Sequence, residues 1–235
     1  NNFNISAVLS RNSLDQPIYP SKGSEISLSV ALTPPYSAWD GVDYENATMQ
    51  EKYSWIEYYK VKFKSKFFFP LTKDNKLVLM GRAEFGFLGH YNPNAKSPFE
   101  TFYMGGDGMS SYSSYSTEYI SMRGYQSGSL TPYDPAVGRN MGYVYNKFTM
   151  ELRYPISLEQ NATIWALAYV EAGNCFADIK DYNPFNLKRS AGVGVRLFLP
   201  MFGLMGIDWG WGFDAINGSK QYGGSQFHFV LGQEL

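Results

Sequence analysis

The chain has little net charge, almost no cysteine and no long hydrophobic run. Its 20 Lys and Arg residues nearly balance 21 Asp and Glu residues, so no strong field attracts nucleic acid. The single cysteine, Cys175, excludes an intrachain disulfide framework and a cysteine-rich metal site. The longest uncharged apolar-rich run, Leu197 to Ile207, is eleven residues long. Since a spanning helix needs about 20 residues, a helical membrane protein is excluded.

Catalytic signals are also missing. The only two histidines, His90 and His228, fall in a predicted loop and a predicted strand, so we expect neither a metal site nor a catalytic triad. The segment Gly105–Gly108 lacks the Lys-Ser/Thr and the following helix of a phosphate-binding loop. We therefore expect a protein that is not an enzyme and holds no cofactor.

Aromatic side chains and alternating polarity are what the chain does have. Tyr, Phe and Trp make up 17% of the 235 residues, although the mean hydropathy is only -0.29. From Tyr59 to Phe69 the odd positions are mostly apolar, while four even positions are lysines. Residues 190–201 and 206–214 also alternate, with glycine at many of the even positions. A period of two residues predicts strands that have two different faces.

The alternation predicts nine strands, most of them 10 to 14 residues long, at about residues 3–13, 24–34, 58–71, 76–89, 142–156, 163–176, 188–201, 204–214 and 225–235. Globular strands average about 5–6 residues, whereas tilted membrane strands need about 9–11. Short and long connections alternate along the chain, which is typical of outer-membrane barrels. The predicted fold is all-β, an antiparallel transmembrane β-barrel. Because single-chain bacterial barrels close with an even number of strands, nine indicate part of a larger barrel.

The amino end gives a second reason to expect a piece of something longer. The first ten residues contain neither an initiator Met nor a basic segment followed by an apolar stretch. Either a targeting segment was removed or the chain continues upstream. We expect residues 1–235 to be the carboxy-terminal part of one barrel domain, with a long loop, residues 90–141, that enters the lumen.

Several segments, taken in order, resemble the BamA superfamily of outer-membrane insertases and two-partner secretion transporters. Met122–Tyr125 is similar to its Val-Arg-Gly-Phe/Tyr motif, at the tip of a long loop that enters the lumen. Phe102–Gly106 is similar to the aromatic-x-x-Gly-Gly that precedes it, and Phe227–Gly232 to the terminal β-signal. The Ser/Tyr-rich insert 110–121 resembles members from the Bacteroidota. The β-signal usually ends in Phe or Trp, whereas this chain ends in Leu235.

The resemblance implies about sixteen strands in the whole barrel, with POTRA domains and the first strands outside this chain. It implies a location in the outer membrane of a diderm bacterium. The expected partners are nascent β-barrel proteins, accessory assembly lipoproteins or other BAM subunits, and outer-membrane lipid, but no nucleic acid.

Arg123 of the similar motif carries a physical expectation of its own. A buried arginine needs carboxylates, because an unpaired buried charge is strongly unfavourable. The resemblance places Glu151 and Glu171 where lumen acids hold this arginine, and Tyr169 offers an aromatic face. Gly124 and Tyr125 complete the expected contact set, since glycine permits a tight turn at the tip. The alternative is a solvated loop arginine.

The leading hypothesis is an insertase that folds β-barrel proteins through a weak seam between its first and last strands. The last predicted strand would offer an edge on which incoming strands pair. Its expected seam residues are Phe227, Phe229, Leu231, Gly232 and Leu235. The alternatives are a polypeptide-secreting transporter of the same superfamily, a passive porin and, more remotely, a soluble ligand-binding barrel.

Overall fold

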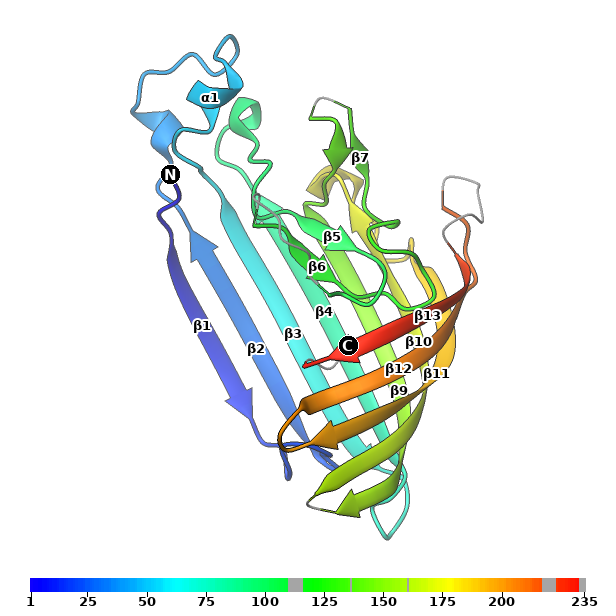
Figure 1. Cartoon of the computed structure of the whole chain (residues 1–235). Helices are drawn as coiled ribbons and strands as arrows, with labels where there is room; N and C mark the ends of the chain where they lie inside the picture. Colours follow the sequence, from blue (N-terminus) through cyan, green and yellow to red (C-terminus); the bar gives the residue numbers. More distant parts are fainter. Residues whose placement is uncertain (110–115, 136, 160, 217–222, 233–235) are drawn as a thin grey trace.

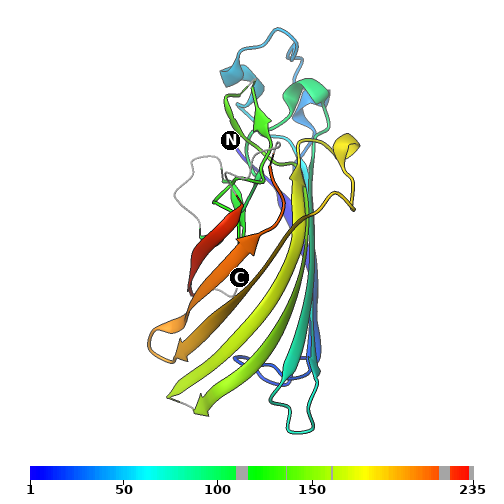
Figure 2. The same ribbon diagram turned by 90° about the vertical axis from the view of Figure 1, so that its right-hand side faces the viewer.

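A single curved sheet dominates the computed structural model, which describes residues 1–109, 116–135, 137–159, 161–216 and 223–232 (Figures 1 and 2). Within these residues it contains nine antiparallel strands in the order β1-β2-β3-β4-β9-β10-β11-β12-β13. The strands are β1 (Ile5–Asn12), β2 (Gly23–Leu32), β3 (Tyr59–Pro70), β4 (Val78–Gly89), β9 (Val144–Glu159), β10 (Ala162–Phe176), β11 (Lys188–Leu199), β12 (Gly203–Gly212) and β13 (Gly224–Leu231).

The nine predicted strands and their antiparallel order are confirmed, with ends that shift by a few residues. β9 extends three residues and β10 one residue into the predicted link 157–162, and β13 ends at Leu231, before its predicted end at 235. Four short strands inside the long loop were not predicted. They are β5 (Phe102–Met104), β6 (Glu118–Ile120), β7 (Tyr133–Asp134) and β8 (Arg139–Asn140).

The helical segments are short and lie in the connections. They are α1 (Met49–Lys52) and the 3-10 turns η1 (Tyr36–Ala38), η2 (Pro93–Ala95) and η3 (Ile179–Asp181). Thr48 begins α1 with a capping box, because its hydroxyl accepts from the Glu51 backbone N–H while the Glu51 carboxylate accepts from the Thr48 backbone N–H. In the described part of the chain, no helix has the length and apolar character needed to cross a membrane.

The faces of the sheet have the opposite polarity from a soluble protein. Along β9 the exposed side chains are apolar, and the buried ones between them are polar or charged. In its central part, Lys147 to Ile156, the exposed residues are Phe148, Met150, Leu152, Tyr154 and Ile156, and the buried polar residues are Lys147, Thr149, Glu151 and Arg153. An apolar convex face with a charged interior fits a strand between lipid and a barrel lumen.

The loop between β4 and β9 folds back into the concave side of the sheet (Figure 1). Its residues Phe102, Met104, Ile120 and Met122 are buried in one apolar cluster together with Tyr145 of β9. Phe102 and Tyr145 meet edge to face, with ring centroids 4.7 Å apart. The concave side of the sheet is therefore covered in part by the chain's own loop.

The convex face gives a test of the lipid environment. Val170 is exposed near the middle of β10. We expect Val170→Arg to lower the free energy of unfolding in phospholipid vesicles by about 2–4 kcal/mol, because the charge enters lipid. Val42→Arg, an exposed position in a connection outside the sheet, is the matched control. Equal effects in urea titrations of the two variants would contradict a lipid-facing surface.

Candidate functional site

The tip of the long loop is built by two glycine-containing motifs that pair with each other. Gly106 N–H donates to the Met122 carbonyl at 3.2 Å, and Met122 N–H donates back to the Gly106 carbonyl at 3.0 Å. Gly105 and Gly106 have φ of 128° and 76°, a region that L residues rarely adopt. These bonds hold Arg123, the next residue, at the innermost point of the loop.

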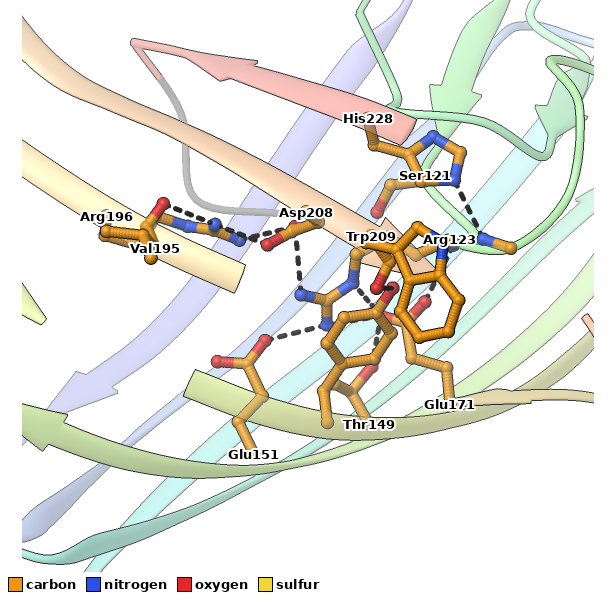
Figure 3. Close-up of polar contacts among 12 residues, drawn as sticks. Ser121, Arg123, Thr149, Glu151, Glu171, Val195, Arg196, Asp208, Trp209 and His228 are labelled. Carbon is orange, nitrogen blue, oxygen red and sulfur yellow. Dashed lines mark hydrogen bonds and ion pairs between the residues drawn. The ribbon is translucent and has the colours of Figure 1, made fainter. Parts of the chain in front are cut away.

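Arg123 is fully buried and contacts three carboxylates from three strands (Figure 3). Its Nη2 lies 2.7 Å from Oε1 of Glu151 and 2.8 Å from Oε1 of Glu171, and its Nη1 lies 3.3 Å from Oδ2 of Asp208. Its Nε and its backbone N–H also donate to Glu171, at 3.1 and 2.9 Å. Burial lowers the pKa of Arg123, but the three carboxylates outweigh it and hold that pKa above its ordinary value.

Tyr169 supplies the fourth side of this site. The Arg123 Cζ atom lies 3.5 Å from the centroid of the Tyr169 ring, a cation–π contact. The structure thus brings together the expected residues Arg123, Glu151, Tyr169 and Glu171. Together with Asp208 they are called the arginine cluster below.

Asp208 was missed by the sequence reasoning. It occupies an even position in the alternation of residues 206–214, where the inward side chains are otherwise mostly glycine. The available signal was an acid flanked by glycines on a predicted lumen face. Its strand is not paired with the strands of the other two acids, so the sequence pattern did not connect them.

Each carboxylate of the cluster also holds a second cation that belongs to the sheet. Arg153 Nη2 lies 2.8 Å from Glu151, and Lys147 Nζ lies 3.1 Å from Glu171. Arg196 donates to Asp208 at 2.7 and 2.8 Å. Each carboxylate is therefore paired with a cation of the sheet as well as with the loop arginine.

Gly124 and Tyr125 fix the tip against the carboxy-terminal strands. A Cβ on Gly124 would lie 2.7 Å from the Gly212 backbone N of β12, and the φ of Gly124 is 85°. Gly124 N–H donates to Nε2 of His228 at 2.8 Å, a contact that no sequence signal indicated. The hydroxyl of the buried Tyr125 donates to the Arg189 carbonyl at 2.9 Å and accepts from the Asp214 N–H at 3.2 Å.

Three of the expected seam residues lie on β13, which is the last strand of the sheet in the described residues, and Gly232 directly follows it. Phe227, Phe229 and Leu231 point outward and are 66, 56 and 61% exposed. Gly232 has φ 73°, and its N–H donates to the Leu204 carbonyl at 2.7 Å. Leu235 lies outside the described residues. Among the described side chains, no three His, Cys, Asp or Glu residues gather as metal ligands do.

Comparisons with known proteins agree with this architecture. Residues 1–235 match the family model described as the Omp85 superfamily domain. The outer membrane protein assembly factor BamA of Neisseria meningitidis serogroup B is 32% identical over 180 residues, which cover 74% of this chain and 18% of that protein. The crystal structure of Haemophilus ducreyi BamA lacking POTRA domains 1–3 is similar at a TM-score of 0.67 and 20% identity. That match covers 97% of this chain and 42% of the other.

The arginine cluster generates the first prediction for the site. We expect Arg123→Ala to destabilise the placement of the loop by about 3–5 kcal/mol, because it leaves buried carboxylates without one of their cations. Arg123→Lys should rescue only in part, since one ammonium does not reproduce the planar fork. The measurement is protease cleavage within residues 116–135 of the membrane-embedded protein. Arg189→Ala removes an exposed pair with Asp214 and should change cleavage little.

Close approach at the tip generates a second prediction. Gly124→Ala adds both an unfavourable φ, about 1 kcal/mol, and a clash with β12. Gly138 has a similar φ of 73° in the same loop, but nothing lies within 4 Å of its Cβ position. Gly138→Ala is therefore the control that isolates backbone strain. We expect the Gly124 variant to lower the melting temperature more, and equal shifts would mean that contact with β12 is unimportant.

Proposed function

The chain belongs to the Omp85 superfamily and forms part of an outer-membrane β-barrel, and from this membership we propose that its protein folds and inserts other β-barrel proteins into that membrane. The chain spans less than a fifth of the curated relative's length and less than half of the solved structure's. The proposed activity therefore belongs to the whole protein. It needs no catalytic residue and no cofactor, since strand pairing supplies the chemistry.

The observation that carries this proposal is the contrast between the short last strand and the long strands beside the arginine cluster. β13 has 8 residues, against 16 in β9 and 15 in β10. Each residue of β13 pairs with β12 along one edge. The opposite edge of a strand carries N–H and C=O groups on which another strand can add.

The outward side chains of β13 suit the same role. Phe227, Phe229 and Leu231 place an apolar row on the lipid side, where the apolar face of an incoming membrane strand also belongs. Matching faces favour a register in which apolar residues stay in lipid, because a slip by one residue would turn them into the lumen.

The arginine cluster would serve as an internal brace for this edge. It joins the loop tip to β9, β10 and β12, which fixes the wall next to β13. A rigid wall lets pairing and release occur at β13 without loss of the barrel. The proposed partners are nascent β-barrel proteins, accessory assembly lipoproteins or other BAM subunits, and outer-membrane lipid.

A passive porin fits this interior less well. A porin needs a water-filled lumen, whereas here a loop with a buried apolar cluster lies on the concave side of the sheet. A polypeptide-secreting transporter of the same superfamily remains the alternative, and function in a reconstituted membrane distinguishes the two.

Reconstitution of the full-length protein in liposomes tests the proposal. We expect an unfolded substrate barrel to fold faster in these liposomes than in protein-free ones, because a templating edge lowers the barrier to its first strand pair. Liposomes that hold a closed-barrel porin are the control for lipid disturbance. High conductance without faster folding would indicate a porin, and translocation of a polypeptide without faster folding would indicate a secretion transporter.

A further inference from the structure

The last strand carries one inward polar side chain that contacts the loop tip. His228 is buried in the middle of β13, between the outward Phe227 and Phe229. Its Nε2 accepts the backbone N–H of Gly124 at 2.8 Å, across 104 residues of sequence. Figure 3 shows the imidazole reaching from the last strand to the tip beside Arg123. An accepting Nε2 means a neutral imidazole whose proton is on Nδ1.

This contact adjoins the arginine cluster in a regular way. In the register of β12 and β13, His228 lies directly opposite Asp208. Asp208 contacts Arg123, and His228 contacts Gly124. Two neighbouring residues of the tip are thus held by two cross-strand neighbours, one on each of the last two strands.

The geometry points to His228 as a positioning residue that couples the loop tip to the last strand. Within the described sheet, β13 is held by its ladder to β12 and by inward contacts such as the one from His228 to the loop tip. The bond to Gly124 ties β13 to a loop that the arginine cluster holds in place. This hydrogen bond between Gly124 and His228, called the tether below, makes the orientation of the outer edge of β13 depend on the arginine cluster.

The consequence for insertion rests on the proposed function. A tethered β13 presents its edge in one orientation, whereas an untethered β13 samples several. Loss of the tether should loosen β13 selectively and slow the templating of a substrate strand. The strands β9, β10 and β11 should stay as they are, since their contacts with the loop, through Glu151, Glu171 and the Arg189 carbonyl, do not involve His228.

Three variants of the full-length protein in lipid nanodiscs separate the hydrogen bond from the ring. His228→Phe keeps an aromatic ring but has no acceptor, and His228→Gln keeps an acceptor at a similar reach. His90→Phe changes the other histidine, which lies outside the strands of the sheet. The readout is hydrogen–deuterium exchange of the backbone amides in residues 224–231, compared with those in β9 to β11.

We expect His228→Phe to speed exchange in β13 roughly tenfold, as loss of one buried hydrogen bond would. His228→Gln should stay near wild type, and His90→Phe should have no effect. Wild-type exchange in His228→Phe, or equal exchange in the Phe and Gln variants, would overturn the tether. If His228→Phe does not fold, His228→Asn, which is one methylene shorter than His228→Gln, takes its place in the same comparison.

Substrate folding in liposomes completes the test. Slower folding with His228→Phe and recovery with His228→Gln would support the coupling to insertion. Faster exchange in β13 with unchanged substrate folding would overturn that coupling. If the wild-type protein does not accelerate folding at all, the proposed function fails, while the exchange data still decide whether the tether exists.

Discussion

Burial of the Arg123 guanidinium is the constraint on which the interior depends. A lone cation there would be strongly unfavourable, so the loop takes the position in which three carboxylates and an aromatic ring surround that charge. Those carboxylates come from β9, β10 and β12, so one side chain sets the loop relative to three strands. The glycines at the tip and on β12 follow from the same constraint, because only bare backbone allows such an approach.

Cations on the strands of the sheet explain why the burial of these carboxylates with Arg123 is tolerable. Lys147, Arg153 and Arg196 each pair with one of the three acids, so the acids are compensated in part by the sheet itself. The loop arginine then completes a network of four cations and three anions. Because charged groups in a low dielectric interact strongly, such a network defines one loop position and penalises small displacements.

Sequence alone was sufficient for the strands but not for the interior. Alternation over ten or more residues reports a two-faced strand directly, so all nine strands of the sheet were predictable from their own residues. β5 to β8 have only two or three residues each, too few for a period. Residues of β5 and β6 are buried in the apolar cluster of the loop, a tertiary contact that local sequence does not show. Glu151 and Glu171 were located by the family resemblance. Asp208 and His228 were not, since their meeting with Arg123 and Gly124 depends on curvature that brings distant strands together.

Alternation along each strand explains why a high aromatic content goes together with a low mean hydropathy. Each strand gives alternate residues to lipid and to a charged interior, so the average hides two opposite surfaces. The division has a further consequence at β13. Its lipid face resembles that of the longer strands. Its inward face holds the loop tip through His228, whereas β9 holds the loop through two charged side chains, Glu151 and Lys147. The loop is therefore anchored mainly to the wall at β9 and β10, where charges pair, and more lightly to the last strand.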